Sequence, residues 1–335
     1  MSAEAPTTER PTDEDDPAHR PIVINSAPPP YDGRPWAGKL IPRPRRPRRK
    51  PGPKTPLPAG AAFAVWIMIV CSVVALWVLL FSFVLSGLQE SRDQHELYGQ
   101  LREELALATA PLGGAIDPGS PVAVVQIPAL KVNDLVVVEG TAAGDLQSGP
   151  GHRRDTVLPG QHGTSIVYGR SVMFGAPFAR VTTLHPGATI EVTTGQGDFT
   201  YVVDRVRRIG DPLPAPIGAD SGRLMLVTSE GYGWQTGWAP NRTVYVDATL
   251  QGKTVPASPG RPLAIPAMEK AMQGDSGALV GLVLWLAALV LVVGAVVWGR
   301  VRWGQWQTWL VGVPVVLACA WGSTQLALQL LPNLL

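Results

Sequence analysis

The residues of this chain that could carry out chemistry gather at a polar turn within the stretch Leu158–Phe178. Residues 165–168 alternate and are largely β-branched or aromatic, which favours a β-strand. Pro159-Gly160 precedes this strand, and a second glycine-rich turn begins at Gly169. The pattern therefore predicts that Arg170, directly after Gly169, faces solvent or a substrate.

Thiol chemistry is excluded from the polar centre of the chain. Its two cysteines, Cys71 and Cys319, both lie in apolar stretches, so the centre holds neither a disulfide nor a cysteine nucleophile. No motif points to a cofactor or a metal ion, and we expect neither. The net charge of +2 hides an acidic start beside a basic run, and we expect no nucleic-acid partner.

The first 60 residues are rich in proline and charge and lack a periodic apolar face, so we predict a disordered cytoplasmic tail over residues 1–60. The basic stretch Pro42–Lys54 stands directly before an apolar run. It indicates either a signal that keeps this end in the cytoplasm or an attraction to anionic lipid or a cytoplasmic partner.

Three uncharged stretches are long enough to cross a bilayer, which predicts a multi-pass protein of the cell membrane. The predicted spans are residues 61–88, 278–299 and 308–331, with a cytoplasmic loop at 300–307 that contains Arg300 and Arg302. Leucines at helical spacing predict an amphipathic helix over residues 89–110, which either packs on the domain or acts as a stalk. This topology places the part between the first two spans outside the cytoplasm.

Residues 111–250 contain short β-branched segments separated by Gly, Pro and Asp turns, a spacing typical of an all-β barrel or sandwich. Residues 251–277 are again rich in Pro and Gly. They predict a linker that includes a short interfacial helix at residues 267–273.

The motifs of the central domain resemble those of the sortases, cell-wall transpeptidases of Gram-positive bacteria, and most of all an actinobacterial, class E-like form. The matching stretches are LPGQHG with YGR and GAPF in residues 158–178, IPAL at 127–130, GPGH at 149–152, LVTS at 226–229, and Asn241-Arg242. The resemblance implies a closed eight-stranded β-barrel. It sets Arg170 at the catalytic His position, Ser229 at the catalytic Cys position, and Arg242 at the catalytic Arg position.

The two substitutions change the chemistry that this site could perform. A Ser hydroxyl becomes a nucleophile only with a general base within hydrogen-bond reach, and an arginine cannot accept a proton. We expect His152 to be a structural hydrogen-bonding residue, His162 to lie at the other end of its strand, and His185 to be a turn residue. Glu230, adjacent to Ser229 on a strand, should point to the opposite face and form a surface salt bridge.

Two functions are compatible with these residues. The first is an inactive sortase-like protein that binds peptides or envelope components as a scaffold; the alternative is an active transpeptidase or hydrolase with an atypical Ser centre. In the first case Arg170 and Arg242 would bind a carboxylate, such as an acidic peptide terminus, or a sorting-signal-like peptide of an envelope protein. Tyr232 and Trp234 would line a peptide groove or cover the barrel mouth. A purely structural role for the membrane hairpin is a third possibility.

Overall fold

The computed structural model describes residues 59–231, 240–302 and 304–335, which all fall within one compact unit. The predicted tail therefore lies outside the described residues, apart from its last two positions. The strands are β1 (Pro121–Ile127), β2 (Val132–Glu139), β3 (Gly151–His152), β4 (Gly163–Tyr168), β5 (Thr189–Thr194), β6 (Gly197–Arg208), β7 (Gly222–Glu230) and β8 (Arg242–Gln251). The α-helices are α1 (Ala59–Leu80), α2 (Ser86–Ala106), α3 (Ala278–Arg302) and α4 (Gln305–Gln329).

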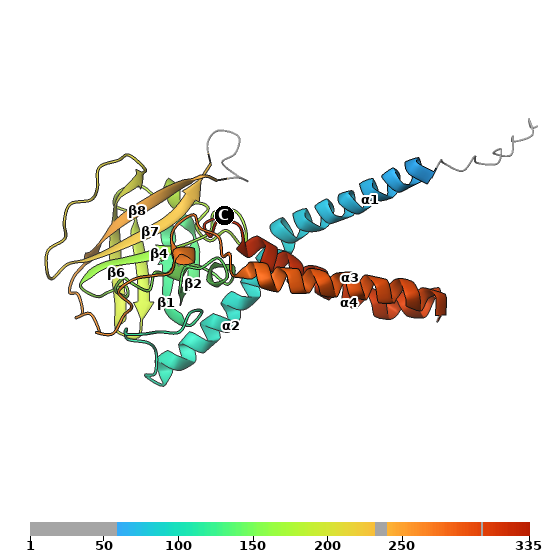
Figure 1. Cartoon of the computed structure of the whole chain (residues 1–335). Coiled ribbons are helices and arrows are strands. Elements are labelled where there is room, and N and C mark those ends of the chain that lie inside the picture. The colour runs from blue at the N-terminus through green and yellow to red at the C-terminus, as the bar shows by residue number, and fades with distance from the viewer. Residues whose placement is uncertain (1–58, 232–239, 303) are drawn as a thin grey trace, which may run out of the picture. The chain divides into compact units, whose positions relative to one another are not determined.

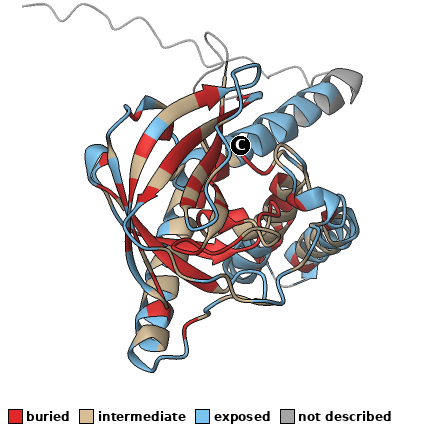
Figure 2. Cartoon of the chain, turned by 90° about the vertical axis from the view of Figure 1, so that its left-hand side faces the viewer, coloured by how far each residue is buried: buried red, intermediate tan, exposed pale blue. Residues whose placement is uncertain are grey.

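The eight strands form a closed barrel in the order β1-β2-β3-β4-β7-β8-β6-β5, which confirms the predicted fold class. Pairings β2–β3 and β4–β7 are parallel, and the others are antiparallel. The interior is filled by buried aliphatic and aromatic side chains from all the longer strands, and Figure 2 shows this buried layer lining the barrel. Closure removes the exposed strand edges through which open sheets aggregate.

The two faces of β7 carry different clusters. Leu224 and Leu226 point into the barrel core. Val227, one residue out of phase, belongs to a separate apolar cluster on the outer face. Ser229 continues the outward series of Val227, so it lies outside the barrel wall at the end of the strand.

Helices α1 and α2 are joined without a break by a π-helical turn, Phe81–Leu85. Leu101 of α2 is fully buried against Val124 of β1 and Val136 of β2, so this amphipathic helix packs on the barrel. Gln94 fixes the contact, because its amide accepts from the Val136 N–H at 2.8 Å and donates to the carbonyl oxygens of Val136 and Ser148. The helix ends at Ala106, before the predicted limit of residue 110.

Helices α3 and α4 pack side by side as a hairpin (Figure 1). Gly281 and Gly322 allow close approach, because a Cβ at either would meet Leu326 or Trp285 of the opposing helix at about van der Waals distance or less. In the part of the chain that the structure describes, three helical stretches are long and apolar enough to cross a membrane: Ile67–Ala106, Ala278–Arg300 and Gln305–Gln329. The hairpin brings the residues after α4 back to the barrel, where Asn333 donates its N–H to the Gln273 carbonyl oxygen at 2.9 Å.

The segment between β8 and α3 is bound to the barrel along part of its length and is not the loose linker that its composition predicts. Val255 pairs with Gln161 in a parallel bridge, and Arg154 forms an ion pair with buried Glu269. The only helical turn recorded here is the 3₁₀ helix Ala267–Glu269, so the predicted helix over residues 267–273 is shorter than expected. Arginine and glutamate anchor this turn where composition alone indicated flexibility.

Candidate functional site

The turn after β4 is attached to the end of β7, and this attachment positions the candidate site. The Gly169 N–H donates to the Val227 carbonyl oxygen at 3.0 Å, and the Thr228 hydroxyl donates to the Gly169 carbonyl oxygen at 2.9 Å. Ser171 is thereby set beside Ser229, with 2.8 Å between their hydroxyl oxygens. Gly169 has no room for a side chain, because a Cβ there would lie 2.3 Å from the Phe178 ring.

Ser229 and Ser171 together hold one backbone carbonyl, that of Leu334. The Ser229 hydroxyl donates to the Leu334 oxygen at 2.7 Å, and the Ser171 N–H donates to the same oxygen at 3.1 Å. The Ser171 hydroxyl lies 3.2 Å from this oxygen. The 330–335 segment that follows α4 thus occupies the position beside Ser229. Nothing in the sequence pattern of residues 330–335 indicated this contact, although Ser171 directly follows the predicted site residue Arg170.

Arg170 is fully buried, so the prediction that it faces solvent was wrong. Its guanidinium donates to the carbonyl oxygens of Ala143 at 2.7 Å, Leu146 at 3.0 Å and Leu335 at 3.0 Å. The Phe174 ring lies 4.8 Å from the guanidinium carbon, within cation–π range. Residues far from β4 in the sequence therefore cover this side chain.

Burial lowers the pKa of Arg170 from its ordinary value to about 9. The group is still a cation at neutral pH and cannot serve there as a base. None of the ion pairs between the described side chains includes Arg170. Main-chain oxygens and an aromatic face surround its charge instead.

Arg242 does not share the outer face with Ser229. In the β7–β8 ladder Ser229 lies opposite Thr243, and Glu230 lies opposite Arg242. Side chains alternate along strands, so Arg242 leaves from the other face of the sheet, where it is exposed. The structure brings Arg170, Ser171 and Ser229 around the 330–335 segment, whereas Arg242 stands apart. Tyr232 and Trp234 lie outside the described residues.

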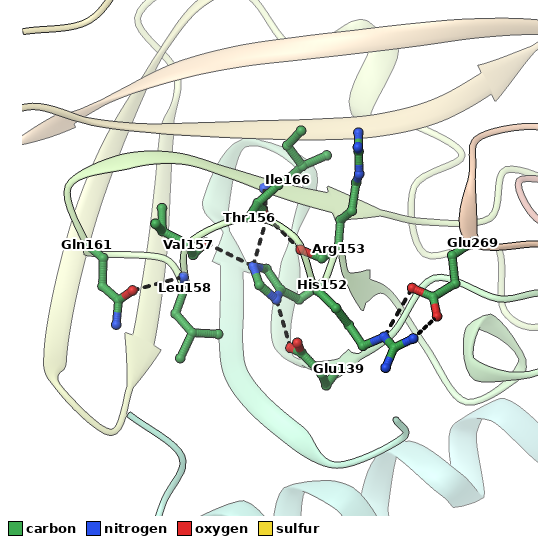
Figure 3. A network of polar contacts seen from close by, with 10 residues as sticks. Glu139, His152, Arg153, Thr156, Val157, Leu158, Gln161, Ile166 and Glu269 are labelled. Atoms are coloured by element: carbon green, nitrogen blue, oxygen red, sulfur yellow. Dashed lines mark hydrogen bonds and ion pairs between the residues drawn. The ribbon is translucent and has the colours of Figure 1, made fainter. Parts of the chain in front are cut away.

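His152 belongs to a separate buried network, drawn in Figure 3, and fits the expected structural role. Its Nδ1 lies 2.7 Å from a carboxylate oxygen of Glu139, and its Nε2 lies 2.9 Å from the Val157 carbonyl oxygen. The Thr156 hydroxyl, 3.1 Å from Nε2, donates to the Arg153 carbonyl oxygen at 2.7 Å. Both ring nitrogens are engaged by the barrel's own groups.

The other polar residues singled out from the sequence have local partners. His162, at the far end of β4 from Arg170, lies 2.5 Å from the Thr254 hydroxyl. Glu230 binds Arg208 through two contacts of 2.6 and 3.0 Å, which confirms the expected surface salt bridge. Among residues 59–231, 240–302 and 304–335, no group of three His, Cys, Asp or Glu side chains could hold a metal ion.

Comparison with known proteins shows what the central domain is similar to. Residues 125–246 match the family model of the sortase domain. Over 162 residues the chain is 26% identical to sortase D of Bacillus subtilis (strain 168), covering 48% of this chain and 72% of that protein. Similar solved structures include the Clostridium perfringens sortase D5 transpeptidase (20% identity, TM-score 0.39, 48% of this chain and 99% of that chain). Another is sortase E from Streptomyces avermitilis (26% identity, TM-score 0.35, 46% and 100%). Residues 125–246, which lie within the barrel, are therefore similar to the sortase domain.

Proposed function

We propose that this chain is a membrane-anchored, extracytoplasmic sortase-like protein that binds a peptide or envelope component without transpeptidation and acts as a scaffold. One observation carries the proposal: the Ser229 hydroxyl donates its hydrogen bond to a backbone carbonyl and has another hydroxyl, Ser171, as its neighbour. A serine nucleophile would need a general base in that place. The actinobacterial, class E-like assignment belongs to this proposal and rests on the sequence motifs.

The charges around Ser229 also favour binding over catalysis. A sortase needs a group that protonates the leaving amine, and Arg170 at that position stays charged while bound to three carbonyl oxygens. His152 has both ring nitrogens engaged within the barrel. A guanidinium, two hydroxyls and an N–H instead make a set of donors suited to peptide carbonyls or to the carboxylate of an acidic peptide terminus. Sorting-signal-like peptides of envelope proteins are the partners that this donor set favours.

The membrane topology is part of the same proposal. Basic residues 42–54 and the pair Arg300 and Arg302 flank the ends of the spans that we assign to the cytoplasm. The α3–α4 hairpin returns residues 330–335 to the barrel, which supports a common side for both. We expect protease added to intact, wall-stripped cells to cleave within residues 89–275. Protection of that region, with cleavage at the 300–307 loop, would reverse the orientation.

A transpeptidation assay tests the proposed lack of catalysis. The full chain in detergent is mixed with a peptide that carries a Thr-Gly bond and with an amine acceptor, and the products are followed by mass spectrometry. We expect no product above the protein-free rate. The matched variants are Ser229→Ala, and Ser229→Cys combined with Arg170→His, of which the second should gain some reactivity. Turnover by the unmodified chain that Ser229→Ala abolishes would establish the atypical Ser centre instead.

A further inference from the structure

We infer that residues 331–335 are an exchangeable occupant of the candidate site, and that its external ligand is a peptide segment of the same chemistry. That chemistry is a leucine-sized side chain carried on a turn and preceded by asparagine and by proline, with the Leu335 N–H donating to the Pro332 carbonyl oxygen. The inference rests on the proposed binding function, since an exchangeable peptide occupant presupposes a site that binds peptides. It adds a ligand class and a means of regulation in cis.

The first step is how the occupant is held. The site groups contact the main chain of the occupant: Ser229 and Ser171 bind the Leu334 carbonyl, and Arg170 binds the Leu335 carbonyl. These donors are fixed on the barrel and bind main-chain oxygens of successive residues. The same hydrogen bonds can therefore form with a peptide from another chain. A separate peptide could present the same two oxygens.

The second step is a side-chain pocket on the outer face of the barrel. The Leu334 side chain is fully buried against Leu146, Tyr168 and Val227. The loop residue Leu146 also offers its carbonyl to Arg170, so the pocket and the cation share one wall. Burial of a leucine-sized group supplies affinity, and the pocket walls select its size.

The third step is a set of backbone contacts that recognises Asn333. Its side-chain amide donates to the carbonyl oxygens of Thr141 at 2.7 Å and Lys270 at 3.1 Å. Its side-chain oxygen is buried and has no hydrogen-bond partner among the described residues. An unsatisfied buried acceptor weakens the closed state, so the occupant is held by less than a full set of contacts.

The fourth step is the tether. Only a few residues separate the end of α4 at Gln329 from Leu334, so the segment is at a high effective concentration beside its site. A free peptide must compete with this segment. Its apparent affinity is therefore its intrinsic affinity multiplied by the fraction of chains in which the segment has left the site. Displacement of the segment should therefore tighten the binding of a free peptide.

Hydrogen exchange on the unmodified full chain tests exchange directly. The probe is the synthetic peptide Leu-Pro-Asn-Leu-Leu, and the control peptide has Asp in place of the first Leu after Asn. At saturating probe, the Asn333 N–H should lose the protection that its bond to Gln273 gives, while the Ser171 N–H keeps a carbonyl partner. Unchanged protection of Asn333 at the highest soluble probe concentration would overturn the inference.

A variant pair measures the competition. Leu334→Asp should expel the segment, and fluorescence anisotropy should show the labelled probe binding about tenfold or more tightly than to the unmodified chain. Leu331→Asp is the matched control, because that leucine is 36% exposed and lies before the pocket. Equal affinity for the unmodified chain and for Leu334→Asp, in variants whose far-ultraviolet circular dichroism is unchanged, would overturn the inference.

Failure of this inference and failure of the proposed function give different results. If the probe neither binds nor changes exchange, the segment is a fixed structural closure, and the absence of transpeptidation is untouched. If the probe is cleaved or joined to an amine acceptor, the proposed function fails, although exchange at the site is then established. Mass spectrometry of the probe after each binding experiment separates the two results.

Discussion

Two buried arginines on the barrel are held in different ways. Arg207 on β6 binds the buried carboxylate of Asp247 on β8 at 3.0 Å, with the Tyr245 ring 4.5 Å from its guanidinium carbon. Arg170 also lies over an aromatic ring, that of Phe174, but its hydrogen bonds go to main-chain oxygens. One guanidinium is bound by a side-chain carboxylate, and the other is bound by main-chain oxygens.

The partners of the two arginines are also brought to them in different ways. Arg207 and Asp247 are on strands that pair directly, so the barrel ladder itself sets their contact. Arg170 depends on Ala143, Leu146 and Leu335, which only the completed fold brings together. Strand pairing thus sets the contact in the barrel wall, whereas the candidate site is assembled from three separate parts of the chain.

The largest expected effect on stability is at Arg207, the arginine that a side-chain carboxylate binds. Arg207→Met leaves the Asp247 carboxylate buried without its main partner, which should cost about 3–5 kcal/mol of the free energy of unfolding. Urea denaturation of the full chain in detergent, followed by tryptophan fluorescence, measures this loss. The matched control is Arg205→Met, since Arg205 is half-exposed and lies 3.7 Å from Asp247. Similar losses in both variants would show that burial of the pair does not matter.

The same contrast explains what the sequence could predict. Short β-branched segments predicted an all-β barrel or sandwich, and the resemblance to sortases selected the closed eight-stranded barrel. The alternation on β7 predicted that Glu230 points away from Ser229 toward a surface ion pair. The burial of Arg170 was missed because, apart from Phe174, the groups that cover it lie in the 143–146 loop and after α4. The position of Arg242 was also missed, since the register of β7 with β8 sets its face.

A smaller loss of stability is expected at Arg170, which is bound by main-chain oxygens. Arg170→Met leaves carbonyl groups unpaired but also removes a desolvated charge, so unfolding should become easier by about 1–3 kcal/mol. The damage should concentrate at the site, with faster hydrogen exchange at Asn333 and Ser171. The control is Arg180→Met, because Arg180 is exposed and donates to the Leu130 carbonyl oxygen. A loss that matches that of Arg207→Met would contradict the comparison.

The loop that holds Arg170 should also respond to pH. Burial, with a contribution from the Glu269 carboxylate, raises the pKa of Asp145 from 3.8 to about 6. The folded chain then binds the proton more tightly than the unfolded chain. This stabilising contribution is complete below pH 4 and is lost as the pH rises through 6.

Asp145→Asn should therefore flatten the stability profile between pH 4 and 6 by about 1–2 kcal/mol. Asn keeps the oxygen that accepts from the Ala142 N–H, so the loop geometry is retained. Denaturation midpoints at several pH values measure the slope. Asp198→Asn, at an exposed aspartate on β6, is the control and should leave the slope in place. An unchanged slope in Asp145→Asn would assign the pH dependence to other groups.

The smallest effect is expected at a third arginine, Arg208. It is paired with a carboxylate, as Arg207 is, but unlike Arg170 and Arg207 it is exposed. Its guanidinium binds both carboxylate oxygens of Glu230, with half of its side chain in contact with solvent. Solvent and salt screen such a pair, so Glu230→Gln should cost only about 0–1 kcal/mol. A double-mutant cycle with Arg208→Met, measured in low and in 0.5 M salt, isolates the coupling, which should shrink at high salt. A coupling as large as that between Arg207 and Asp247 would mean that the carboxylate, and not its burial, distinguishes Arg207 from Arg170. A small coupling leaves desolvation as the difference.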